Sequence, residues 1–212
     1  KLSASNMWID ESDAETATYG IYLYMRDALK SVHDIYLCWG EFRNGLWGAG
    51  TNKTLSGVDQ TQVRTSTMSS SNAYADWSVM YKTVNQANLI LKHVPEMGIS
   101  ESVRNFSLGN AYFSRAWCYF WIARIWGDAP LALTGYESTA GDLYLPRAPK
   151  AEIFARIESD LTEAERYVTD NSDKAVATPA AVQMLKADYA LWMYRVAGGG
   201  SSYLATAEKA IE

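Results

Sequence analysis

Six aromatic and polar residues cluster between residues 34 and 71, a segment without helical periodicity and rich in Gly, Asn, Thr and Ser. Such composition predicts a long loop, and long loops in compact domains are usually functional or mobile. Sugar rings have apolar C–H faces and hydroxyl edges, which suit aromatic rings and planar hydrogen-bonding groups. The candidate ligand-binding residues are Trp39, Glu41, Arg43, Asn44, Trp47 and Asn52.

The two indoles of this segment have a second interpretation. Trp39 and Trp47 also suit a structural role, in which each ring pins the loop onto neighbouring helices. Peptides use the same mixture of aromatic and planar polar groups as sugars do. The segment therefore predicts a binding surface for a sugar or a peptide, and leaves pinning by either indole as the alternative.

Residues suited to catalysis are scarce. His33 and His93 fall near predicted helix ends, where histidine usually caps carbonyls. Cys38 and Cys118 lie among aromatic residues and are expected to be free buried thiols. No zinc-ligand spacing, phosphate-binding loop, dinucleotide fingerprint or nucleophile elbow is present in the sequence. We therefore expect no catalytic residue, no metal site and no cofactor.

Two other classes of function remain open at this point. A glycosidase needs two carboxylates that flank the scissile bond, and Glu41 and Asp128 are the acids beside aromatic loops. Asp128 follows Gly127, however, and is more simply a turn residue. A helical-repeat adaptor that binds other proteins is the second alternative, and it predicts no effect of glycans.

Composition narrows the class of protein. The chain has 212 residues with 48% hydrophobic residues and a formal net charge of −5. The apolar share excludes a disordered chain, and the acidic balance argues against nucleic-acid binding, which needs clustered Lys and Arg. No uncharged apolar run reaches the 18 residues of a membrane-spanning helix.

Helical periodicity covers most of the remaining chain. Ser12 and Glu15 form a capping-box pattern that begins the first helix, and Asn72 is expected to cap the second. Pro149 and Thr178-Pro179 are signals for the start of two later helices. Gly127 and the glycines at 198–200 are stop signals. No strand pattern appears. The expected helices are 12–33, 72–94, 100–126, 149–168, 178–197 and one that starts at 202.

The helix at 100–126 carries apolar residues on almost all sides and should be central. Arg115 lies within it, and a buried guanidinium needs a partner, with Asp160 or Asp76 expected. Asn85 and Asn88 interrupt an otherwise apolar face and are expected to bond backbone in the 34–71 segment. The class is all-α, built from antiparallel helix pairs, with a tetratricopeptide-like repeat or an irregular bundle left open.

Several motifs follow one another in a recognisable order, in the segments 77–91, 109–116, 126–131, 145–148, 157–164, 178–194 and 207–211. Their order resembles the N-terminal part of the SusD/RagB family, from about Thr16 onward. Gly109-Asn110-Ala111 stands where that family often has Gly-Glu-Ala, and Leu37-Cys38-Trp39-Gly40-Glu41 has Glu41 where the family often has Asp.

This resemblance implies a tetratricopeptide-like core of helix pairs with right-handed superhelical packing and long irregular loops. It implies that residues 1–212 form a single N-terminal helical domain, without the C-terminal half of the family fold. It also implies a surface lipoprotein of the bacterial outer membrane that binds oligosaccharide, or peptide in some branches, without catalysis. The implied partner is a SusC-like TonB-dependent transporter, and the lipid anchor would lie on a cysteine that this chain does not contain.

Overall fold

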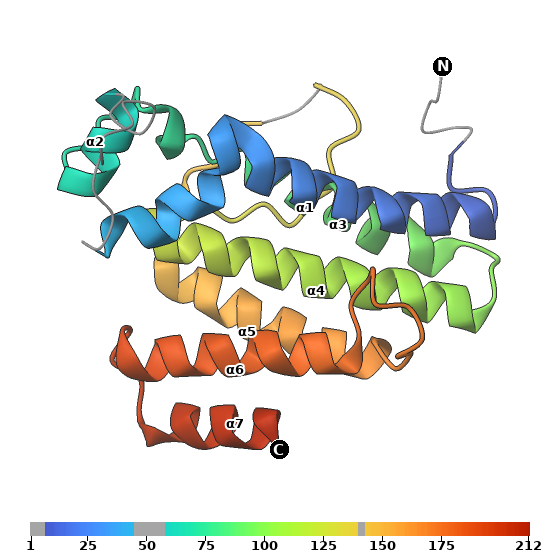
Figure 1. The fold of residues 1–212 in the computed structure, drawn as a ribbon. Coiled ribbons are helices and arrows are strands. Elements are labelled where there is room, and N and C mark those ends of the chain that lie inside the picture. The colour runs from blue at the N-terminus through green and yellow to red at the C-terminus, as the bar shows by residue number, and fades with distance from the viewer. Residues whose placement is uncertain (1–6, 45–57, 140–142) are drawn as a thin grey trace. The chain divides into compact units, whose positions relative to one another are not determined.

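A computed structural model describes residues 7–44, 58–139 and 143–212 of the chain, and they are mostly helical (Figure 1). This confirms the predicted all-α class. Among these residues, no helix combines the length and apolar character needed to cross a bilayer. The main helices are α1 (Glu11–Gly40), α2 (Val58–Thr65), α3 (Ser78–His93), α4 (Glu101–Trp126), α5 (Lys150–Tyr167), α6 (Pro179–Arg195) and α7 (Ser201–Ile211).

Three short 3-10 helices accompany them: η2 (Glu41–Arg43), η4 (Ala73–Ala75) and η5 (Val94–Glu96). Two-residue strands β1 (Ala129–Pro130) and β2 (Arg147–Ala148) pair antiparallel. The sequence contains no alternating pattern at either position, because a ladder this short buries too little surface to need one. The expectation of no strand is therefore wrong at these four residues.

The chain divides into two compact units. We call Lys1–Tyr22 together with Thr83–Glu212 the larger unit, and Leu23–Lys82 the smaller unit. Helices α1 and α3 each contribute residues to both units.

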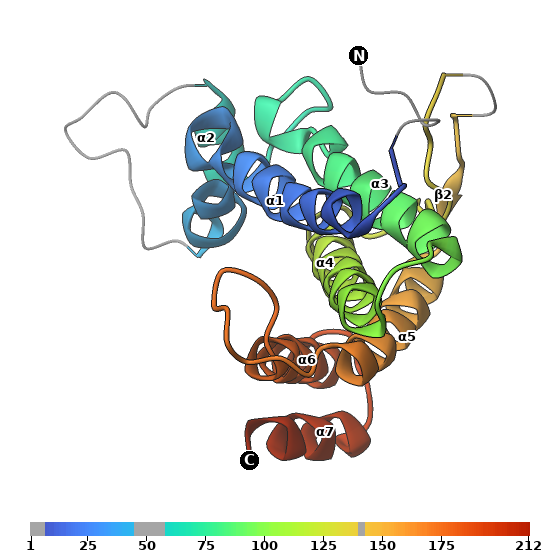
Figure 2. The same ribbon diagram turned by 90° about the vertical axis from the view of Figure 1, so that its right-hand side faces the viewer.

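Helix pairs build the larger unit, as the sequence predicts (Figure 2). The beginning of α1 packs beside the end of α3, where Gln86 Nε2 donates to the Ala17 carbonyl at 3.0 Å. Helices α4 and α5 form the next pair, followed by α6 and α7. Helix α4 is buried on nearly every side, which confirms its predicted central place.

Arg115 forms the predicted buried ion pair at the centre of the larger unit. Its Nε and Nη2 donate to the two carboxylate oxygens of Asp160, both at 2.7 Å, and its Nη1 donates to Asn88 Oδ1 at 2.7 Å. Asp160 has no exposed surface. The pair is bidentate and desolvated, so α3, α4 and α5 are joined by charge-assisted hydrogen bonds.

The predicted partner loop for the two asparagines of α3 is wrong. Asn85 Nδ2 donates to the Tyr136 carbonyl at 3.1 Å, and its Oδ1 accepts from the Tyr136 N–H. Asn88 Nδ2 donates to the Ala132 carbonyl at 2.9 Å. Both side chains bond backbone, and Asn88 Oδ1 also accepts from Arg115, so both amides are satisfied as burial requires. The backbone that they bond lies in the segment after β1 rather than in 34–71.

Several helix starts differ from prediction by a few residues. Asp10 and Asp13, rather than Ser12 and Glu15, begin α1: Asp13 Oδ2 accepts from Ile9 N at 2.8 Å, and Asp10 Oδ1 accepts from Asp13 N at 3.1 Å. Pro149 is the N-cap of α5 and not its first helical residue. At α1 the Asp10 carboxylate already satisfies a free N–H group of the first turn, and at α5 the Asp128 carboxylate, which is distant in the sequence, accepts from Lys150 N.

The helix boundaries marked by glycine and threonine are confirmed. Thr178 Oγ1 accepts from Ala181 N at 3.2 Å and caps α6. Gly127 follows α4 with a φ of 71°, a left-handed conformation that glycine adopts without a Cβ penalty.

The smaller unit contains more helix than the loop prediction for 34–71 allows. Helix α1 continues to Gly40, and Ile35, Cys38 and Trp39 are buried at helical spacing. Helix α2 covers Val58–Thr65. Asn72 is a cap as predicted, since its Oδ1 accepts from Tyr74 N at 2.9 Å, but it caps η4 rather than α3. The sequence did not predict these short helices, because the glycines of the segment are typical of a loop.

Candidate functional site

The end of α1 and the turn η2 bring three of the six candidate residues together in the smaller unit. Glu41, Arg43 and Asn44 are all exposed. Asn44 Nδ2 donates to Glu41 Oε2 at 2.9 Å, and the Asn44 backbone N–H donates to the Glu41 carbonyl at 3.3 Å. The turn therefore places the Glu41 carboxylate beside the Asn44 amide. Arg43 lies between these two residues in the sequence.

Trp39 lies in a different environment from these three residues. It is 8% exposed, and its Nε1 donates to the Tyr74 carbonyl at 2.9 Å. A buried indole needs such an acceptor for its N–H group. The geometry matches the pinning interpretation of this residue: the ring fastens the end of α1 to η4 and leaves little surface for stacking.

Trp47 and Asn52, the other two candidates, lie outside the described residues. The structure therefore brings together Glu41 and Asn44 with Arg43 beside them, and places Trp39 beneath the surface of the same unit. These groups can accept and donate planar hydrogen bonds, which suits recognition of hydroxyl groups.

Residues that the sequence did not single out hold this region in place. Gln60 Nε2 donates to Tyr74 Oη at 3.0 Å, and Asn72 Nδ2 donates to the Asp59 carbonyl at 3.1 Å. Burial raises the pKa of Tyr74 to about 12, so its phenol stays neutral. Of these contacts, the sequence predicted only the role of Asn72 as a helix cap. The others are tertiary contacts between α2 and η4, which residue types alone do not indicate.

The cysteines are free and buried, as expected. Burial raises the pKa of the Cys38 thiol and that of the Cys118 thiol, which makes both poor nucleophiles. Within the part of the chain that the structure describes, no group of three or more His, Cys, Asp and Glu side chains is placed to hold a metal ion.

His93 and Asp128 have structural partners in the larger unit. The His93 ring stacks on Trp8 with centroids 4.9 Å apart, and its Nε2 lies 3.0 Å from Glu137 Oε1. Lys92 also donates to Glu137. Asp128 Oδ1 accepts from Lys150 N at 2.8 Å and so caps α5. The side chain of His33 lies outside the described residues.

Comparison with known proteins gives consistent results. A curated relative, the SusD-like protein P38 of Formosa agariphila, is 27% identical over 168 residues, which are 79% of this chain and 32% of P38. The solved structure of B. fragilis NanU is 28% identical with a TM-score of 0.78, over 99% of this chain and 42% of that one. The chain thus spans less than half the length of these relatives.

A second similar structure was solved with a xylogluco-oligosaccharide. It is 22% identical, has a TM-score of 0.76 and covers 93% of this chain and 39% of that one, which shows a shared fold.

A family model described as starch-binding and associating with the outer membrane matches residues 49–192. That range is more than half of the chain, and the family comprises non-catalytic binding proteins. The shared fold agrees with the tetratricopeptide-like helix pairs of the larger unit. The chain therefore belongs to the SusD-like family.

Proposed function

We propose that this protein binds oligosaccharides at the surface of the bacterial outer membrane and delivers them uncleaved to a SusC-like TonB-dependent transporter. The observation that carries the proposal is the match of residues 49–192 to a family described as starch-binding and associated with the outer membrane. A structurally similar protein solved with a xylogluco-oligosaccharide supports the same class of ligand.

The proposed ligand surface is the turn after α1 together with the residues that follow it. Glu41, Arg43 and Asn44 supply exposed planar groups, and Trp47 and Asn52 complete the proposed set. Trp39 acts from beneath, since its bond to Tyr74 fixes the end of α1. Each planar group pairs with sugar hydroxyls, and the indole of Trp47 stacks on a ring face.

Membrane attachment in this proposal comes from a lipid on a cysteine outside this chain. The transporter contacts a helical surface of the protein, and the sugar passes from one to the other with no bond broken. The exposed polar side chains of the turn are hydrogen-bonding groups, which supports a binding role.

Calorimetric titration tests the proposal. The 212-residue chain is titrated with maltoheptaose and with a xylogluco-oligosaccharide, and one of them is expected to bind. Replacing Trp47 with Ala should weaken binding about two- to tenfold, the value of one aromatic contact. Arg43→Ala should weaken it as well, whereas Arg64→Ala, an exposed arginine on α2, is the matched control and should not.

Three results contradict the proposal. Binding that is unchanged in both Trp47→Ala and Arg43→Ala removes the turn from the site. Release of shorter sugars when the chain is incubated with either oligosaccharide shows cleavage, and overturns the non-catalytic role. Absence of binding to any oligosaccharide favours the helical-repeat adaptor instead.

A further inference from the structure

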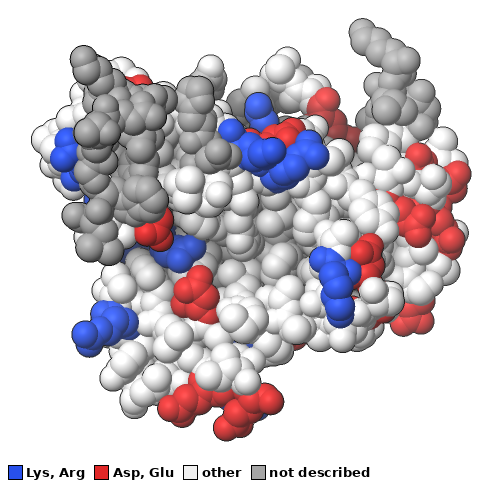
Figure 3. All heavy atoms as spheres, in the orientation of Figure 1, with Lys and Arg blue, Asp and Glu red and all other residues white. Residues whose placement is uncertain are grey.

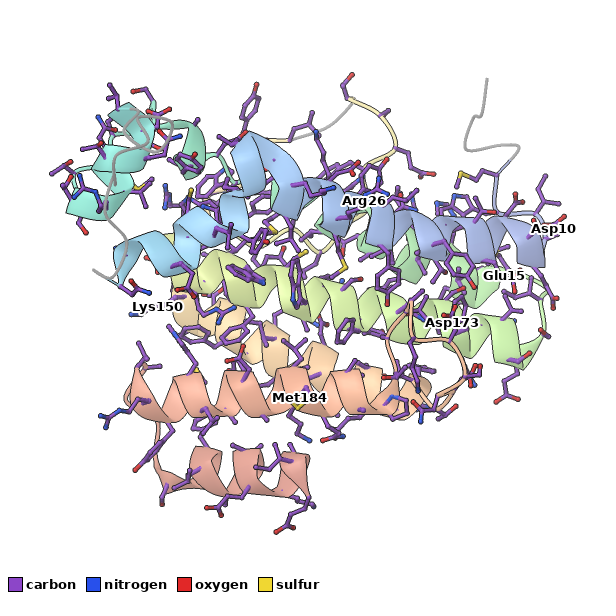
Figure 4. The ribbon with its side chains drawn as sticks, in the orientation of Figure 1. Asp10, Glu15, Arg26, Lys150, Asp173 and Met184 are labelled. Atoms are coloured by element: carbon purple, nitrogen blue, oxygen red, sulfur yellow. The ribbon has the colours of Figure 1, made fainter. Side chains whose placement is uncertain are left out.

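A pocket of about 560 Å³ lies in the larger unit, apart from the residues of the proposed oligosaccharide site. Its walls come from the beginning of α1, the beginning of α4, and the loop that joins α5 to α6. Figure 4 shows Glu15 on α1 and Asp173 on that loop, which rises toward α1 and α4. The volume is within the roughly 300–1,000 Å³ typical of small-molecule sites.

The floor of the pocket is buried and its polar groups are already paired. Asn110 is 2% exposed. Its Oδ1 accepts from the Ala177 N–H at 3.0 Å and from the Tyr22 hydroxyl, and its Nδ2 donates to the Phe106 carbonyl at 2.7 Å. Val168 completes the floor with an apolar surface. A ligand therefore meets a fixed base and takes its polar contacts from the rim.

The rim is acidic. Glu15, Asp170 and Asp173 line the pocket and are exposed. The loop holds its two carboxylates in place: Asp170 accepts from Ser172 N at 2.9 Å and from Ser172 Oγ at 2.7 Å, and Asp173 accepts from Ala175 N at 2.8 Å. Figure 3 shows that Asp and Glu predominate over the beginnings of α1 and α4.

Aromatic rings form the sides of the pocket. Tyr19 and Phe106 lie 5.8 Å apart between ring centroids, with planes inclined by 53°. Tyr167 stacks on Tyr112, with centroids 6.0 Å apart. Tyr19, Phe106 and Tyr167 all line the pocket, and ring faces attract both sugar C–H groups and organic cations.

No Lys or Arg is among the described residues that line this pocket. The ammonium of Lys174, next to Asp173, bonds to the carbonyl and side-chain oxygens of Asn171 and also interacts electrostatically with Asp170. Among the described residues, no group of three or more His, Cys, Asp and Glu side chains is placed to hold a metal ion. The combination of negative charges and ring faces suits an organic cation better than a metal ion or an anion.

We propose that this pocket binds a small ring compound that carries a protonated amine, with an amino sugar as the representative ligand. The ring packs against Tyr19 and Phe106, and the ammonium group meets the carboxylates of Glu15 and Asp173. This site is independent of the proposed oligosaccharide surface, because the two share no residue.

NMR titration of the 212-residue chain with glucosamine below neutral pH tests the proposal. Glucose and N-acetylglucosamine are the ring-matched neutral controls. Glucosamine is expected to shift amide signals around the pocket and to bind more tightly than either control. The double variant Glu15→Gln/Asp173→Asn should weaken this binding about fivefold, the sum of two exposed ion pairs, and Glu208→Gln, an exposed acid on α7, should leave it unchanged.

The proposal is overturned if glucosamine binds no more tightly than glucose, or if the double variant binds it as well as the parent chain does. Both variants change exposed side chains, and their amide spectra show directly whether they are folded. The single variant Tyr19→Ala is a second test. Loss of glucosamine binding supports the proposed contact between the ligand ring and Tyr19, and unchanged binding contradicts that contact.

Discussion

The larger and the smaller unit are stabilised in different ways. In the larger unit, Arg115, Asp160 and Asn88 bond side chain to side chain across three helices. In the smaller unit, single contacts such as the bond from Trp39 to the Tyr74 carbonyl join short elements. The difference indicates that the larger unit has a hydrogen-bonded polar network at its centre, and that the segment proposed to bind sugar depends on a few individual hydrogen bonds.

The largest expected effect comes from breaking the ion pair in the larger unit. Asp160→Ala leaves the Arg115 guanidinium buried without its charge partner, which should cost about 3–5 kcal/mol of unfolding free energy. Asp188→Ala is the control, since its 3.5 Å contact with Arg124 is exposed and should change stability by about 0–1 kcal/mol. Urea unfolding followed by circular dichroism measures both. Equal losses of unfolding free energy in the two variants would show that the buried Arg115–Asp160 pair stabilises the larger unit no more than an exposed ion pair does.

The second effect concerns a close backbone approach in the same unit. A Cβ at Gly109 would lie 2.7 Å from Val168 Cγ2 and 3.0 Å from Val168 N. Gly109→Ala should therefore cost about 1–3 kcal/mol through displacement of the start of the α5–α6 loop.

The control for this variant is Gly20→Ala, where the nearest atom to the new Cβ is Gln86 Nε2 at 3.8 Å. In this helical position alanine should stabilise the chain by about 0.4–1 kcal/mol. Thermal unfolding should thus move in opposite directions for the two variants. A shift in the same direction would contradict the packing that places α4 against α5.

The third effect tests the smaller unit. Trp39→Phe keeps an aromatic ring and removes the N–H donor to the Tyr74 carbonyl, at a cost of about 1 kcal/mol. Amide hydrogen exchange should speed up within residues 23–82. Trp192→Phe, in the larger unit, should leave exchange in 23–82 unchanged. If the two variants have the same exchange pattern, the Trp39 bond does not hold the smaller unit together.

The smallest effect is electrostatic and depends on pH. The hydrogen bond from Lys92, followed by the nearby His93, holds the pKa of Glu137 below its ordinary value of 4.5. Since the folded pKa is lowered, this contribution to stability is present above about pH 4.5 and is lost as the pH falls through the folded pKa. Glu137→Gln should destabilise the chain slightly, by less than about 1 kcal/mol, near neutral pH.

Unfolding curves at several pH values measure this contribution. The stabilities of Glu137→Gln and the parent chain should converge as the solution becomes more acidic. A difference that persists at low pH would show that Glu137 acts through packing rather than through its charge.

Sequence reasoning recovered most of the larger unit. Periodicity placed α4 at the centre, and the cost of burying a charge identified Asp160 as one of two partners for Arg115. These features were predictable because each follows from local spacing or from one strong energetic requirement.

The smaller unit was predicted less well for a physical reason. Helix α2 is short and mostly polar, with Val63 as its buried residue, so it has almost no periodic signal. The burial of Trp39 depends on where the Tyr74 carbonyl lies, which is a tertiary contact that residue types do not encode. The sequence therefore found the candidate segment but could not separate the indole that packs from the groups that face solvent.

One consequence of the two buried thiols has practical use. Cys38 belongs to the smaller unit and Cys118 to the larger unit, and neither is accessible to a reagent until its surroundings open. Maleimide added to the native chain should therefore label each cysteine at the rate at which its own unit exposes it. Mass spectrometry of the two labelled peptides would then report, from one sample, the separate opening rates of the larger and the smaller unit.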